Sequence, residues 1–336
     1  MKLVHAGLDR LAMWMEDRVR HTAQPYLPCP PEPLDCFGPL PGVPDPPARD
    51  GPWSAPSPRP LGPWDRMTLH VLSRRAPFRG TAIVVPPWKT EAPSLVRRYT
   101  DLLAGTGHDV WLLVPPEHMG RTSPGARSGH GFATLDLTRF RALFEQLVVE
   151  IRTALAMAAR RGRAGVVGLS IGALAASFAL ASEEAPGFGA LLAPPADLAA
   201  VLGTTRIGRR YGRLAAEAGT RWPDLRELRR VLSPFDPLRA LRPRSPLFLA
   251  VGLYDRIALP DGALALGRAW GVQPRVYARG HLSLLFLCRA LIEDLRRFVL
   301  EPADVGRAAP AAPSGERGPD GPGGALTARG DGAAPA

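Results

Sequence analysis

Short apolar runs alternate with amphipathic segments through the middle of this 336-residue chain. The runs are apolar at nearly every position, which is typical of strands buried on both faces of a sheet, and the segments between them repeat apolar residues at helical spacing. This alternation predicts an α/β fold with a mostly parallel central sheet and helices on both faces. The predicted strands are 81–87, 109–116, 164–170, 187–195, 245–255 and 274–281, and the predicted helices are 94–107, 137–162, one directly after 170 and one that closes the domain after 281. An alternating segment at 65–75, ahead of the series, is typical of an edge strand.

One stretch, "RAGVVGLSIGALAASFALA" (163–181), carries a serine inside an almost entirely apolar run. Its length is near the lower limit for a membrane helix, but its glycines and serines suit a turn better. Gly168-Leu-Ser170-Ile-Gly172 stands after an apolar strand and before an Ala-rich helix, which is the pattern of a nucleophile elbow. In such a turn the serine is strained and its neighbours two positions away must be small, because strand and helix crowd together there. The alternative is a glycine-rich turn with a capping serine.

A base and an acid follow the serine in the chain. His281 is the one histidine after Ser170, and it comes just after the last predicted strand, where its ring could reach the serine. Asp255 ends the strand before it and could orient the imidazole. Asp261 is the second choice for the acid and Asp197 a distant third. The plainer alternatives are a loop or capping histidine and a turn-forming aspartate.

With Ser170, Asp255 and His281 in this order, the chain resembles the α/β-hydrolase superfamily from about residue 65 to 300. The resemblance implies the α/β-hydrolase fold. It also implies a serine hydrolase that cleaves a small-molecule carboxylic ester or thioester through an acyl-enzyme, with no metal or organic cofactor. Three alternatives stay open: an acyltransferase or a peptidase on the same triad, and a non-catalytic binding protein of this fold.

The loop after the first parallel strand departs from the superfamily pattern. Many members carry His-Gly there, and a backbone amide of that loop completes the oxyanion hole. This chain has Val85-Pro86-Pro87-Trp88-Lys89 instead. Because proline has no N–H, the two prolines cannot donate. We therefore expect the oxyanion hole to use the backbone N–H groups of Ile171 and Trp88, with Lys89 as the alternative to Trp88.

The composition divides the chain into three parts. Residues 1–64 are predicted to form an N-terminal helix and a proline-rich arm, 65–300 the hydrolase domain, and 304–336 a Gly/Ala/Pro-rich disordered tail. Within the domain, segment 197–244 is too long for an ordinary connection and has helical stretches, so it predicts a helical lid or cap insertion.

Two further segments should border the pocket. The loop 117–131 contains His118 and His130, for which a simple loop role is expected. Four lid arginines are more consistent with a solvated helix face than with an anionic subsite; they are Arg206, Arg209, Arg210 and Arg213.

Apolar residues also recur at helical spacing near the N-terminus, at Val4, Leu8, Leu11, Met15 and Val19. They predict an amphipathic helix that packs on the main body. Contact of this helix or of the lid with a membrane surface is the weaker alternative, since the polar face of the helix has mixed charge.

The charge and cysteine content narrow the function classes. The formal net charge is +11, but the arginines are spread along the chain and form no basic tract, so nucleic-acid binding is not expected. Three scattered cysteines, Cys29, Cys36 and Cys288, do not make a disulfide framework or a zinc site and suit a reducing compartment. The prediction is a cytoplasmic protein, and the sequence leaves its oligomeric state open.

Overall fold

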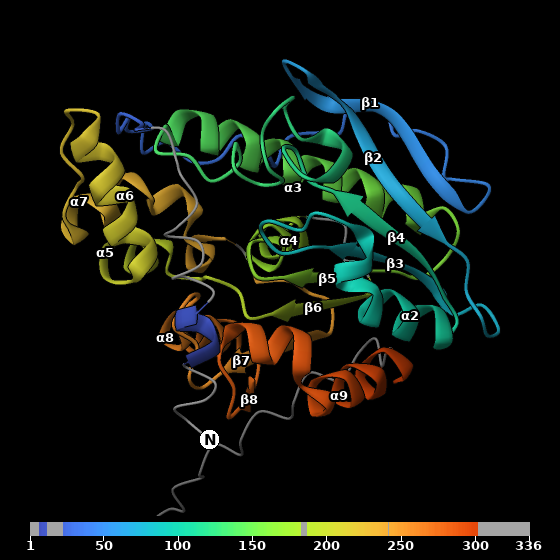
Figure 1. The fold of residues 1–336 in the computed structure, drawn as a ribbon. Coiled ribbons are helices and arrows are strands. Elements are labelled where there is room, and N and C mark those ends of the chain that lie inside the picture. The colour runs from blue at the N-terminus through green and yellow to red at the C-terminus, as the bar shows by residue number, and fades with distance from the viewer. Residues whose placement is uncertain (1–6, 12–22, 183–186, 241, 302–336) are drawn as a thin grey trace, which may run out of the picture. The chain divides into compact units, whose positions relative to one another are not determined.

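The computed structural model describes residues 7–11, 23–182, 187–240 and 242–301. Within them, one sheet of eight strands has the order β1-β2-β4-β3-β5-β6-β7-β8 (Figure 1). β2 pairs antiparallel with β1 and with β4, and all other neighbouring pairs are parallel. The predicted mostly parallel sheet is therefore confirmed. Its strands are β1 (Gly51–Leu61), β2 (Trp64–Leu72), β3 (Gly80–Val85), β4 (His108–Val114), β5 (Ala164–Leu169), β6 (Phe188–Leu192), β7 (Leu247–Gly252) and β8 (Arg275–Tyr277).

Helices cover both faces of the sheet, as the sequence predicted. Successive residues of a strand point to opposite faces, and β3 shows this: Ile83 and Val85 belong to one apolar core, whereas Ala82 and Val84 belong to the other. The first core is completed by α3 (Leu137–Ala159), α4 (Ile171–Leu180) and α8 (Pro260–Trp270). The second is completed by α2 (Arg97–Gly105) and α9 (Arg289–Leu300), which lie on the same side of the sheet in Figure 1.

The proline-rich arm before the sheet runs along α3. Proline supplies no backbone donor, so the carbonyl groups of such a segment need partners from elsewhere. Arg141 and Arg152 of α3 supply them. Their guanidinium groups donate to the carbonyl oxygens of Pro30, Glu32, Pro33, Cys36 and Gly38. The arm is thus held against the helix by arginine side chains.

The positions of β1 and β2 differ from the prediction for residues 51–75. β1 lies inside the segment predicted to be an arm, so the sheet begins at Gly51 and not at residue 65. The segment 65–75 was predicted to be the edge strand, but β2 lies between β1 and β4, and β1 is the edge. Proline is tolerated in an edge strand, where one row of N–H groups has no sheet partner. The proline content of β1 therefore fits its position at the sheet edge. It is also the reason that β1 was not predicted as a strand.

The end of the domain also differs from expectation. Helix α8, between β7 and β8, was not predicted, although Pro260 at its first turn and the left-handed Gly271 at its end are ordinary helix boundaries. The closing helix was predicted as one segment after His281. It is divided into a π-helical stretch, Ser283–Leu287, and α9, with a break at Cys288.

Three short helices fill the connection between β6 and β7: α5 (Leu198–Thr204), α6 (Arg206–Glu217) and α7 (Leu225–Val231). At the start of each helix, the side chain of the capping residue accepts a backbone N–H of the first turn. The capping residues are Asp197 for α5, Thr205 for α6 and Asp224 for α7. These caps satisfy donors that have no partner within the helix. The predicted helical character of 197–244 agrees with this part of the structure.

The two ends of the chain are only partly described. Residues 7–11 are helical, but Leu11 is 51% exposed whereas Asp9 is fully buried, so the predicted apolar face is wrong at Leu11. Val4, Met15 and Val19 lie outside the described residues, as does the predicted disordered tail, 304–336. Among the helices of the described residues, none is long and apolar enough to span a bilayer.

Candidate active site

Ser170 occupies the turn between β5 and α4. Its backbone has φ 53° and ψ −119°, a conformation that costs a non-glycine residue about 1–3 kcal/mol. A Cβ on Gly168 would lie 2.5 Å from the carbonyl oxygen of Gly172, and a Cβ on Gly172 would lie 2.5 Å from that of Val85. Larger side chains would therefore push the helix away from the strands. The strained turn and the need for small neighbours are both as the sequence predicted.

The structure brings Ser170, Asp255 and His281 together. Ser170 Oγ lies 3.0 Å from His281 Nε2, and His281 Nδ1–H donates to Asp255 Oδ2 at 2.7 Å. The other carboxylate oxygen of Asp255 accepts the backbone N–H groups of Ile257 and Ala258, each at 2.8 Å. Both carboxylate oxygens are thus occupied, which fixes the orientation of the side chain that holds the imidazole.

These residues come from the carboxyl ends of β5, β7 and β8, which meet at one edge of the sheet. All three side chains are buried. Burial by itself lowers the pKa of His281, but the hydrogen-bonded Asp255 carboxylate, with a smaller contribution from Asp9, outweighs it and raises the pKa above the usual histidine value. The arrangement can take a proton from Ser170 and stabilise the resulting imidazolium.

The two fallback acids lie elsewhere. Asp197 caps α5, where its carboxylate accepts the Ala200 N–H at 2.8 Å. Asp261 lies in the first turn of α8. Asp255 is the carboxylate that His281 contacts.

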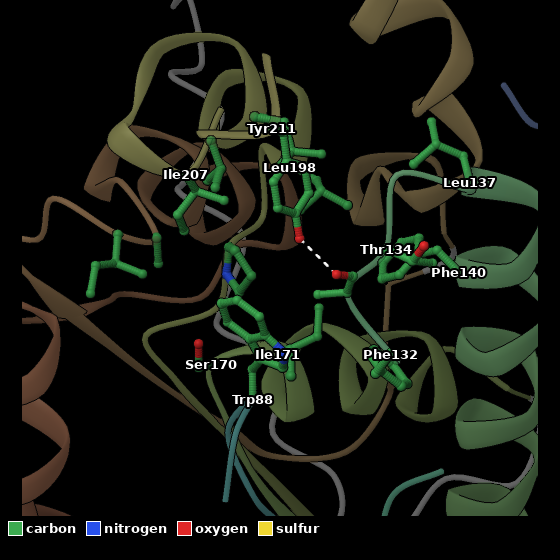
Figure 2. Close-up of a pocket in the computed structure, with 16 residues that line it drawn as sticks. Trp88, Phe132, Thr134, Leu137, Phe140, Ser170, Ile171, Leu198, Ile207 and Tyr211 are labelled. Atoms are coloured by element: carbon green, nitrogen blue, oxygen red, sulfur yellow. Dashed lines mark hydrogen bonds between the residues drawn. The ribbon is translucent and has the colours of Figure 1, made fainter. Parts of the chain in front are cut away.

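The loop after β3 contains the expected second half of the oxyanion hole. The Lys89 N–H donates to His118 Nε2 at 3.3 Å, so this amide already has an acceptor. The Trp88 ring donates through Nε1 to the Gly129 carbonyl oxygen at 2.6 Å, and Trp88 lines the same cavity as Ser170 and Ile171 (Figure 2). Of the two residues, Trp88 is the one that lines the cavity beside Ser170.

His118 lies beneath this loop as a neutral side chain. Burial lowers the pKa of its imidazole to about 4. The neutral ring has one N–H, and the partners identify where it is: Nδ1–H donates to the Pro116 carbonyl oxygen at 2.8 Å, which leaves Nε2 free to accept from Lys89. His118 was expected to have a plain loop role. It lines neither of the two cavities described below, whereas His130 lines the more polar one.

An apolar cavity adjoins Ser170 (Figure 2). Its walls come from the loops after β3 and β4, the start of α3, the elbow, the helices α5 and α6, and the loop after Asp255. Tyr211 of α6 closes one side, where its hydroxyl donates to the Ala133 carbonyl oxygen at 2.9 Å. The lining residues are Trp88, Phe132, Ala133, Thr134, Leu137, Phe140, Ser170, Ile171, Pro195, Leu198, Val201, Leu202, Ile207, Tyr211, Ile257 and Ala258.

A second, more polar cavity lies on the other side of this wall. It shares Trp88, Ala133, Thr134 and Tyr211 with the apolar cavity. Glu117 and Arg139 line it as an ion pair with an N–O separation of 2.6 Å. An apolar cavity at the serine and a more polar cavity thus share lining residues, among them Trp88 and Tyr211.

Possible metal ligands and the three cysteines can be compared with the sequence expectations. Within the described ranges, no group of three or more His, Cys, Asp or Glu side chains is arranged to hold a metal ion. Cys29, Cys36 and Cys288 are buried free thiols. Burial raises the pKa of Cys36 to about 12, so this thiol stays protonated and unreactive at neutral pH.

No protein-family model matches this chain, and no curated protein matches it either. Among solved structures, it is similar to the acetyl xylan esterase from Paenibacillus sp. R4, with 15% identity, a TM-score of 0.51, and coverage of 70% of this chain and 79% of that chain. It is also similar to the Pyrococcus horikoshii acylaminoacyl peptidase, with 13% identity, a TM-score of 0.50, and coverage of 70% and 38%. The chain has the α/β-hydrolase fold. At these identities the similarity concerns the α/β-hydrolase fold alone, which confirms the fold class predicted from the sequence.

Asp9 contacts this site, and the sequence did not reveal the contact. Its carboxylate accepts the backbone N–H of His281 at 2.8 Å. The residues before it form part of a short amphipathic pattern, and nothing in that pattern distinguishes a buried carboxylate from a solvated one. The contact joins positions 272 residues apart, which no local pattern can predict.

Proposed function

We propose that this protein is a serine hydrolase that cleaves a carboxylic ester or thioester. The observation that carries the proposal is the hydrogen-bonded chain from Ser170 Oγ through His281 to Asp255, with the serine on a strained turn. Each of these residues alone has an ordinary structural explanation. Their alignment at hydrogen-bond distance is the geometry that nucleophilic acyl transfer requires.

The reaction has two halves. His281 Nε2 takes the Ser170 proton as Oγ attacks the carbonyl carbon, and the imidazolium then protonates the departing alcohol or thiol. A water molecule, deprotonated by the same nitrogen, attacks the acyl-enzyme, and the acid leaves as His281 returns the proton to Ser170. Asp255 holds the Nδ1–H tautomer and stabilises the imidazolium.

The negative charge on the carbonyl oxygen is stabilised by backbone N–H groups. We assign these to Ile171, at the start of α4, and to Trp88. The helix N-terminus adds a favourable dipole to the first of them. The assignment to Trp88 rests on the engagement of the Lys89 N–H by His118.

The acyl group belongs in the apolar cavity beside Ser170. Nearly all of its lining side chains are aliphatic or aromatic, so an acyl chain gains free energy by leaving water there. Leu198, Ile207 and Tyr211 come from the segment between β6 and β7, so this insertion acts as a lid that selects the acyl chain. The alcohol or thiol leaves through the polar cavity beyond Tyr211.

A fluorophosphonate probe tests the mechanism directly, because it reacts with an activated serine and not with an ordinary hydroxyl. We expect the intact protein to be labelled once, and Ser170→Ala to be unlabelled. Equal labelling of both proteins, or no labelling of the intact one, would contradict the proposal. A panel of p-nitrophenyl esters with acyl chains of different length, with and without an alcohol acceptor, then separates hydrolysis from acyl transfer.

A further inference from the structure

A short helical segment from the N-terminus lies against the loops that carry Asp255 and His281. The described part, residues 7–11, is blue in Figure 1 and lies near α8 and β7. Within it, Asp9 is fully buried, whereas the neighbouring Leu11 is 51% exposed. The segment therefore makes its deepest contact through a carboxylate and not through an apolar side chain.

That carboxylate accepts three backbone N–H groups. Asp9 Oδ2 accepts from His281 at 2.8 Å and from Arg256 at 3.2 Å, and Oδ1 accepts from Leu282 at 3.0 Å. One donor belongs to the histidine of the triad, and another to the residue directly after Asp255. A single side chain thus connects the main chains of both loops.

The donors explain why a carboxylate is needed at this place. His281 and Leu282 begin a helical stretch, and N–H groups in the first turn of a helix have no partner within it. The nearest polar side chain, Ser283, is engaged with Gly280. Asp9 therefore caps this helical turn from a distant part of the chain, and its hydrogen bonds offset part of the cost of burying its charge.

We propose that Asp9 is a positioning residue of the catalytic triad: its carboxylate fixes the two loops relative to each other so that the His281 ring stays in line between Asp255 and Ser170. This inference rests on the hydrolase function proposed above. It makes the N-terminal segment a part of the active site. Asp9 acts through the main chain and contacts neither the substrate nor the reacting atoms.

The charge of Asp9 gives the role a measurable signature. The charged groups that it faces are Asp255 and His281; burial is the main reason that its own pKa is raised, and Asp255 adds to this. In return the Asp9 carboxylate contributes to the raised pKa of His281. Removal of the charge should therefore lower the pKa of His281 and move the acid limb of the pH profile of kcat/KM to lower pH.

The test uses the full chain with Asp9→Asn, which keeps the size of the side chain but turns one acceptor into a donor that faces an N–H. We expect kcat to fall by about 10²-fold with little change in KM, since small misplacements of catalytic groups cost about this much. We also expect the acid limb to move to lower pH, and hydrogen exchange at the His281 and Leu282 amides to become faster. Leu11→Ala is the matched control on the same segment and should behave as wild type.

The outcomes separate this inference from the proposed function. Fluorophosphonate labelling of the wild type reports the hydrolase mechanism, whatever Asp9 does. An Asp9→Asn protein that is folded and keeps the wild-type kcat and pH profile would overturn the positioning role. So would a variant whose loss of activity is matched by an equal loss of folded protein in thermal unfolding, because Asp9 would then hold the fold and not the geometry of the triad.

Discussion

His118 accepts the backbone N–H of Lys89 through its Nε2 atom, and this bond supports the assignment of the oxyanion donor to Trp88 and not to Lys89. Replacement of His118 by phenylalanine keeps a flat ring but leaves the Lys89 N–H without its acceptor. We expect kcat to fall by about 10- to 10²-fold, less than the 10²–10³ lost with an oxyanion donor itself, because Trp88 is displaced and not removed. Steady-state kinetics measure the effect. His70→Phe, on strand β2, is the control. An unchanged kcat in His118→Phe would show that His118 does not support the loop that carries Trp88 and Lys89.

Gly129 allows the loop 117–131 to lie close to the loop after β3, which carries Trp88 and Lys89. A Cβ at this position would lie 2.8 Å from both the Lys89 nitrogen and Trp88 Cδ1, and φ is +78°. Gly125 in the same loop has φ +76° but nothing within 4 Å of an added Cβ. Gly125→Ala should therefore cost only the left-handed backbone strain, about 1–2 kcal/mol, whereas Gly129→Ala adds a clash with the oxyanion loop.

The two glycine variants are distinguished by thermal unfolding and by the rate of fluorophosphonate labelling. We expect both Tm values to fall, and labelling to slow only in Gly129→Ala. Equal labelling rates in the two variants would show that the oxyanion loop tolerates the extra atom.

Three aspartates follow Ser170 as candidate acids, and the structure separates their roles. Asp255→Asn keeps the size of the side chain but favours the wrong imidazole tautomer, for which a loss of about 10⁴ in kcat is expected. Asp261→Asn and Asp197→Asn serve as controls; neither residue contacts His281, and asparagine is also a good cap for α5. We expect both controls to keep nearly the wild-type kcat. A large loss in either one, with Asp255→Asn active, would reassign the acid.

The pH dependence follows from the state of His281. The imidazole must be neutral to accept the Ser170 proton, so activity is present above its pKa and is lost as pH falls through it. Because the pKa is raised, chiefly by Asp255 against the effect of burial, the acid limb of kcat/KM should lie above the ordinary histidine value of about 6.5. Its midpoint is read from kcat/KM between acid and neutral pH, and a midpoint below the ordinary value would contradict the proposed environment.

How well the sequence predicted each part of this site depends on how far apart the interacting residues lie along the chain. The need for glycine at 168 and 172 could be predicted, because the crowding that requires small residues arises at the strand–turn–helix segment itself. Asp255 and His281 were found from their order and from the strands before them, since parallel strands bring their carboxyl ends to one edge. Asp9 was not found, because its role depends on a contact across 272 residues.

The errors in the fold have a similar physical origin. β1 was assigned to the arm because a strand rich in proline looks irregular, and only its place at the sheet edge makes it possible. His118 does lie in the predicted loop, but its burial was not predicted, because a single histidine in a polar loop does not signal it. The proposed choice of Trp88 over Lys89 rests on the hydrogen bond of the Lys89 amide, which exists only in the folded loop and is not visible in the sequence.

The apolar cavity beside Ser170 should set the preference for acyl chain length. Val201 of α5 lines it, so Val201→Phe fills part of the space that a long acyl chain would occupy. We expect the ratio of kcat/KM for octanoyl over acetyl p-nitrophenyl esters to fall by about tenfold or more, since each methylene group accommodated in an apolar pocket is worth roughly 10-fold or more. Val201→Ala should leave the ratio near or above that of the wild type. The acetyl ester is the internal control in every variant, because its acyl group has only one methyl group to place in the cavity. A ratio that stays at the wild-type value in Val201→Phe would place the octanoyl chain outside this cavity.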